Sequence, residues 1–178
     1  MSHHQHTILS LCGALLLCLL FVVGAFHGRA DEPFTVQLIS MAWHGNNPGN
    51  DTSTYPTVSD NGRFITYVSD ASNVVQDDNN GERDVFVYDR ATQETELISQ
   101  STSGVLGNAI SGCQNQSGPT ISAEGRYVAF CSAASNLVSG DTNGAVDVFL
   151  VDRERDTIER ITNAFDGSET DDTSTHAS

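Results

Sequence analysis

Between residues 56 and 162, apolar and polar side chains alternate with a period of two, which is the pattern of half-buried β-strands. Short segments rich in Gly, Asn and Asp separate these runs. The pattern predicts strands at 56–59, 63–69, 84–89 and 95–99, and again at 119–122, 126–132, 147–152 and 158–162. β-Branched and aromatic residues dominate the middle strands of each set, as strands favour. No stretch after residue 30 has the period of an amphipathic helix, so the sequence predicts an all-β fold.

The two sets of strands belong to an internal repeat. Residues 56–99 (PTVSDNGRFITYVSDASNVVQDDNNGERDVFVYDRATQETELIS) align without a gap with residues 119–162 (PTISAEGRYVAFCSAASNLVSGDTNGAVDVFLVDRERDTIERIT). About 20 of the 44 positions are identical. Gly62 and Gly125 are expected to supply the positive φ of a tight turn between the first two strands. Four antiparallel strands that recur at a fixed spacing are the unit of a β-propeller blade.

The repeat resembles the TolB-like, WD-repeat-type β-propeller repeats of secreted and periplasmic bacterial proteins. The motifs that carry the resemblance are P-x-[IV]-S-x-x-G-R-[FY]-[IV]-x-[FY], then A-S-N-[VL]-V, then D-x-N-G-x-x-D-V-F and a closing D-R. The resemblance covers both copies and implies two propeller blades. It implies no single activity, because such repeats serve as binding and scaffolding modules and as accessory domains of hydrolases.

The segments around the repeats predict how the blades continue. Residues 31–55 contain TVQLIS at 35–40, which matches the last strand of each repeat. The segment is therefore predicted to form an orphan closing strand followed by a linker. Residues 100–118 are the inter-blade linker. Residues 163–178 contain DTSTHAS, which echoes DTSTYPT at 51–57 and predicts the start of a truncated third blade. We therefore expect an incomplete propeller, with assembly of several copies into a ring as the alternative.

Residues 1–30 have the composition of a signal peptide. An uncharged apolar run at 8–26 precedes Gly28 and Ala30, which fit the small positions of a cleavage site before Asp31. The first residues, MSHHQH, lack the Lys or Arg usual in a signal peptide. The run is also long enough to span a bilayer, so an uncleaved anchor is the alternative. The sequence thus predicts a secreted or periplasmic protein, or one held at the membrane only by this segment.

The chain is strongly acidic and poor in cysteine. Its 23 Asp and Glu against 8 Lys and Arg give a formal net charge of −15. This balance argues against nucleic-acid binding, which needs basic patches to neutralise phosphates, and fits a solvated acidic surface, cation sites or adaptation to high salt. Beyond the leader, Cys113 and Cys131 remain, and in an oxidising compartment such a pair predicts a disulfide. A buried Cys131 with a free Cys113 is the alternative.

The segment between the second and third strands of each repeat contains D-x-N-G-x-x-D. Its side-chain oxygens have spacings found in calcium loops, and the candidate ligands are Asp78, Asn80 and Asp84 in the first copy and Asp141, Asn143 and Asp147 in the second. Both copies lack the first acid of the longer D-x-D-x-D-G motif and the distant bidentate Glu of an EF-hand. Because Asx residues and glycine also form turns with no ion, metal-free turns are the alternative.

Other recurrent polar residues are interpreted structurally. The Asp of each closing D-R pair, Asp89 and Asp152, is expected to cap the turn that follows. Arg63 and Arg126 are expected to form ion pairs between blades. The Asn of each A-S-N motif, Asn73 and Asn136, is expected to order its loop through side-chain to backbone hydrogen bonds.

Catalytic signatures are missing from the sequence. There is no G-x-S-x-G elbow, and beyond the leader the histidines are His44 and His176, each in a polar linker, which does not favour a catalytic triad or a zinc site. We therefore predict a non-catalytic, exported propeller module that binds a protein or a cell-envelope polysaccharide, with Ca²⁺ as the candidate cofactor. The alternative is an accessory propeller domain of a secreted hydrolase whose catalytic part lies outside this chain.

Overall fold

The computed structural model describes residues 36–112 and 118–163. The chain divides into two units, residues 1–37 and 38–178, and the first lies almost wholly outside the described residues. The predicted leader at 1–30 also lies outside them, as does all but the first residue of the predicted linker and third-blade start at 163–178. Within the described ranges the structure is built from strands, and no helix there is long and apolar enough to cross a membrane.

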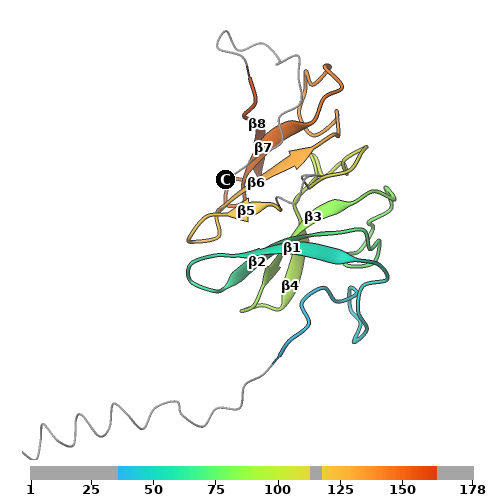
Figure 1. The fold of residues 1–178 in the computed structure, drawn as a ribbon, viewed down its shortest axis with the longest axis vertical. Helices are drawn as coiled ribbons and strands as arrows, with labels where there is room; N and C mark the ends of the chain where they lie inside the picture. Colours follow the sequence, from blue (N-terminus) through green and yellow to red (C-terminus); the bar gives the residue numbers. More distant parts are fainter. Residues whose placement is uncertain (1–35, 113–117, 164–178) are drawn as a thin grey trace, which may run out of the picture. The chain divides into compact units, whose positions relative to one another are not determined.

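Each repeat forms one four-stranded antiparallel sheet, which confirms the all-β, blade-like fold (Figure 1). The first sheet consists of β1 (Ser53–Val58), β2 (Phe64–Ser69), β3 (Asp84–Asp89) and β4 (Glu94–Leu97). The second consists of β5 (Thr120–Ile121), β6 (Tyr127–Ser132), β7 (Asp147–Asp152) and β8 (Thr157–Arg160). In both sheets the strands neighbour one another in chain order, as hairpin connections dictate.

The register of the central strands is the same in both sheets. Phe64 lies opposite Asp89 between β2 and β3, and Tyr127 lies opposite Asp152 between β6 and β7. The turn before each central pair is closed by a glycine: Gly62 has φ 69° and Gly125 has φ 83°. Their amides donate to the carbonyls three residues earlier, at 2.8 and 2.9 Å. The predicted glycine turns are therefore confirmed.

Residues 36–40, in the segment predicted as a closing strand at 35–40, are not in a strand, and the closing role stays a prediction. A strand is stabilised by ladder hydrogen bonds to a neighbour, and none of the described strands pairs with this segment. The loop after this segment nevertheless makes the same hydrogen bond as the loop after the last strand of the first repeat. The Gly49 amide donates to the Ser40 carbonyl at 2.9 Å, as the Gly107 amide donates to the Ser99 carbonyl at 3.1 Å.

Stacked aromatic rings occupy equivalent positions in the two sheets. Tyr67 and Phe86 have ring centroids 5.6 Å apart in the first sheet, and Phe130 and Phe149 have centroids 5.9 Å apart in the second. The first pair packs with loop residues and with Ile39, whereas the second packs against the opposite face of the first sheet. The cluster that joins the sheets contains Val68, Val85, Val87, Ile98, Val128, Phe130, Ala134, Leu137, Phe149 and Val151. Burial of each large side chain contributes about 1.5–3 kcal/mol, so this cluster is the main source of cohesion between the sheets.

Polar contacts also cross from one sheet to the other. The Arg153 guanidinium donates to Glu96 Oε2 from Nε at 2.9 Å and from Nη2 at 2.6 Å. It also lies 4.7 Å from the centre of the Phe64 ring, whose other neighbour is Arg63 at 4.7 Å. The Thr57 hydroxyl donates to the Pro119 carbonyl at 2.9 Å. Because Arg153 contacts both a carboxylate and a ring of the other sheet, it aligns the two sheets as well as attracting them.

Candidate functional site

The loop before β3 brings the predicted calcium residues of the first repeat together. Asp84 is fully buried at the start of β3. Its Oδ1 accepts a hydrogen bond from the Ser99 hydroxyl at 2.5 Å, and its Oδ2 accepts one from the Asn80 amide nitrogen at 2.8 Å. Asn80 Oδ1 in turn accepts from the Glu82 backbone amide at 3.0 Å. Asn80 therefore joins the carboxylate to the turn that Gly81 makes with φ 73°.

The second repeat has the same arrangement at the start of β7. Asp147 Oδ1 accepts from the Thr162 hydroxyl at 2.6 Å, and Asp147 Oδ2 accepts from the Asn143 amide nitrogen at 3.2 Å. Asn143 Oδ1 accepts from the Ala145 amide at 2.9 Å. In both loops the asparagine nitrogen faces the carboxylate, which is the bonding pattern of the metal-free turn. The calcium interpretation stays a prediction.

The two loops differ at the remaining aspartate. Asp141 Oδ1 lies 3.4 Å from an Arg160 guanidinium nitrogen, which also lies 3.8 Å from Asp147 Oδ2. The first repeat has Leu97 at the position of Arg160. There Asp78 is 8 % exposed, and its buried Oδ1 has no hydrogen-bond partner. The sequence motif is the same in both loops, but a guanidinium, that of Arg160 in β8, lies next to the carboxylates of the second loop only.

The two buried aspartates of the first loop have raised pKa values. Burial raises the pKa of Asp78 above its usual value. Burial also raises the pKa of Asp84 to about 6, and the negative charges of Asp78 and Glu82 act in the same direction, while the hydrogen bonds from Ser99 and Asn80 oppose the shift. Removing a carboxylate from water disfavours its charged form unless a positive charge compensates. Within the described residues, no group of three or more His, Cys, Asp or Glu side chains forms a metal centre.

A second recurrent cluster pairs the Asn of each A-S-N motif with an asparagine that directly follows a glycine. Asn73 Oδ1 accepts from the Asn50 amide at 2.9 Å, and Asn136 Oδ1 accepts from the Asn108 amide at 3.0 Å. The loop-ordering role predicted for Asn73 and Asn136 is confirmed. Their partners were missed, because Asn50 and Asn108 lie outside the 44-residue alignment and only the shared Gly-Asn dipeptide signals them.

The roles predicted for the arginines need one correction. Arg63 pairs with Asp89 at 2.7 Å and Arg126 pairs with Asp152 at 2.6 Å, so both ion pairs lie within a sheet and not between blades. The cause is register, since each arginine directly precedes the residue that faces its aspartate across the ladder. The turn-capping role of the aspartates is confirmed: Asp89 Oδ1 accepts from the Ala91 amide at 2.8 Å.

The predicted disulfide involves one residue of the described part. Cys131 lies in β6 and is fully buried, next to Val148. Cys113 lies outside the described residues. The Cys113–Cys131 pairing therefore stays a prediction.

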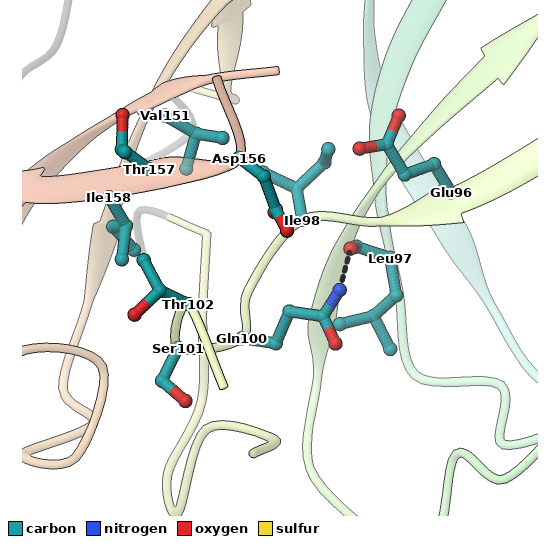
Figure 2. A pocket seen from close by; sticks show the side chains of 10 residues that line it. All are labelled: Glu96, Leu97, Ile98, Gln100, Ser101, Thr102, Val151, Asp156, Thr157 and Ile158. Carbon is teal, nitrogen blue, oxygen red and sulfur yellow. Dashed lines mark hydrogen bonds between the residues drawn. The ribbon is translucent and has the colours of Figure 1, made fainter. Parts of the chain in front are cut away.

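A groove of about 570 Å³ lies beside the first loop. Its lining combines apolar side chains, amide side chains and the carboxylate of Asp77, and includes Gln76, Asn79, Asn80, Leu97, Gln100 and Leu106. A second, smaller cavity of about 20 Å³ lies between the end of β4 and the β7–β8 hairpin (Figure 2). In it the Gln100 side chain donates to the Leu97 carbonyl at 3.1 Å. Its volume suits a single water molecule, so the groove is the candidate ligand site.

No family model matches the chain, and no curated protein sequence matches it. Among solved structures, the chain is similar to an oligogalacturonate lyase in complex with manganese, with 12 % identity and a TM-score of 0.34. That similarity covers 67 % of this chain and 27 % of the other, so this chain spans much less than the length of the structure it matches.

Proposed function

We propose that this chain is an exported, non-catalytic module that binds a neutral polysaccharide or a peptide. The observation that carries the proposal is the groove beside the first loop. Amide side chains offer both donors and acceptors, and apolar lining residues favour the less polar face of a ligand. The net charge of −15 disfavours polyanions, including nucleic acids. Sugar hydroxyls and peptide groups match such a lining.

The experiment compares groove and control variants in two binding assays. Co-sedimentation with chitin and with cellulose, which are both uncharged, tests polysaccharides, and selection from a displayed peptide library tests peptides. We expect retention by one of these probes and a loss of at least about tenfold in affinity for Gln76→Ala combined with Gln100→Ala, equivalent to about 1.4 kcal/mol. Ser139 is the counterpart of Gln76 in the second repeat and does not line the groove, so Ser139→Ala is the matched control. Binding that the groove variant leaves unchanged would contradict the proposal.

Export is the other part of the proposal. The apolar run at 8–26 and the small residues Gly28 and Ala30 support it. Expression in a bacterial host, followed by fractionation and N-terminal sequencing, tests it directly. We expect a chain that begins at Asp31 in the periplasm or medium. An unprocessed chain in the membrane fraction would favour the anchor, and an unprocessed chain in the cytoplasm would contradict export.

A further inference from the structure

The two D-x-N-G-x-x-D loops have the same carboxylates but different charge balances. In the second repeat, the Arg160 guanidinium faces both Asp141 and Asp147, and its side chain is only 9 % exposed. In the first repeat, Asp78 and Asp84 are buried without such a partner. Burial of two carboxylates is costly unless a cation compensates them. The two aspartates of the first loop therefore lack the neighbouring positive charge that Arg160 of β8 gives to the two aspartates of the second loop.

The side chains near the first loop do not supply this charge. Arg83 directly precedes Asp84, but its guanidinium makes two hydrogen bonds to Asp70, both 3.0 Å long. Leu97, at the position of Arg160, packs with Tyr67 and Phe86 in the apolar cluster of the first sheet. A cation at this loop must therefore come from solution.

We propose that the first loop binds a divalent cation, Ca²⁺ by its oxygen donors, between Asp78 and Asp84, where the second loop holds the Arg160 guanidinium. Asp78 Oδ1 is the first ligand, because it is buried and has no other partner among the described residues. The proposal concerns a metal site and does not depend on the ligand of the groove.

The hydrogen bonds to Asp84 leave room for a cation. Each carboxylate oxygen has two lone pairs, and Asp84 Oδ2 accepts one hydrogen bond, from Asn80. Its counterpart, Asp147 Oδ2, accepts from Asn143 at 3.2 Å and still lies 3.8 Å from Arg160. With two carboxylates, the remaining ligands would be backbone carbonyls and water, which is typical of weak extracellular sites with a Kd of about 10⁻⁴–10⁻³ M.

The first test is thermal unfolding of the purified chain with increasing CaCl₂ at constant ionic strength. At about ten times the Kd, we expect Tm to rise by about 3–5 °C. Asp78→Asn should remove this rise. Asp141→Asn makes the same charge change in the loop that holds Arg160, and should retain the rise. A Tm that calcium does not change, or an equal loss in both variants, would overturn the proposal.

The second test exchanges the two counterpart residues and measures bound calcium by equilibrium dialysis. We expect one ion for the wild-type chain, two for Arg160→Leu and none for Leu97→Arg. If Arg160→Leu does not fold, the comparison of Asp78→Asn with Asp141→Asn decides. Increased stability of Asp78→Asn together with no bound calcium in the wild-type chain would mean that the carboxyl pair shares a proton instead, and would overturn the cation site.

Discussion

Replacement of Tyr67 by phenylalanine is expected to stabilise this protein. Tyr67 lies in β2, is 2 % exposed, and its buried hydroxyl has no hydrogen-bond partner. Burial raises the pKa of the Tyr67 hydroxyl to about 12, and the nearby Thr95 side chain acts in the opposite direction. The second repeat has Phe130 at the same position, in the same stacked arrangement. The repeat therefore shows that the fold accepts a ring without the oxygen.

The magnitude follows from the unpaired hydroxyl. A buried hydroxyl without a partner costs about 1–3 kcal/mol. The variant loses the contacts of one oxygen atom, at about 0.1–0.2 kcal/mol for each atom pair. We therefore expect Tyr67→Phe to raise the free energy of unfolding by about 1 kcal/mol. The reverse change, Phe130→Tyr, places a hydroxyl in the cluster between the sheets and should lower it by about 1–3 kcal/mol.

Urea denaturation followed by circular dichroism measures both changes. The m-value should be the same for all three chains, because the surface exposed on unfolding hardly changes. A loss of about 1 kcal/mol or more in Tyr67→Phe would refute the reasoning, since it would mean that the hydroxyl makes a hydrogen bond in the folded protein.

Two further substitutions test the turn glycines and the ion pairs. Gly125 and Gly140 have similar φ angles, 83° and 82°, but a Cβ added at Gly125 would overlap the Phe64 ring of the other sheet, whereas a Cβ added at Gly140 meets open space. Gly140→Ala should therefore cost about 1–3 kcal/mol of backbone strain, and Gly125→Ala should cost more. Chemical denaturation that shows no larger loss of stability for Gly125→Ala would contradict the close approach. Hydrogen bonds from Arg126 lower the pKa of Asp152 to about 2 from 3.8, so its contribution to stability is present above about pH 4 and is lost as the pH falls towards 2. The Asp152→Asn variant should therefore show a smaller loss of Tm between pH 4 and 2 than the wild-type chain, and equal losses would show that the pair does not act through this titration.

The strands and turns could be predicted because their signals are local. A period of two marks each central strand, and a strand buries one face whichever neighbour covers it. The positive φ of Gly62 and Gly125 likewise depends on the turn alone. The closing strand at 35–40 differs from these, because a strand there also needs a neighbour with free hydrogen-bonding groups, which the local pattern does not specify.

Side-chain partners were harder to predict than strands. The motif places Asp78 and Asp141 in equivalent loops, but Arg160 reaches its aspartates from β8, nineteen positions along the chain from Asp141 (160 − 141). The residue at the same place in the first repeat, Leu97, appears in the sequence as an ordinary apolar strand position. Only the folded structure, in which β4 and the loop lie side by side, shows that Leu97 leaves the aspartates of the loop without a neighbouring guanidinium.

The sequence by itself determined that this protein consists of repeated four-stranded units with glycine turns, since these follow from periodicity and backbone conformation. Only the tertiary structure decided that Arg63 pairs within its own sheet, that Phe130 packs between the sheets while Tyr67 does not, and that the first acidic loop lacks the cation of the second. These outcomes depend on which face of a strand meets which neighbour. Electrostatic and packing energies act through distances in space, which the order of residues does not specify.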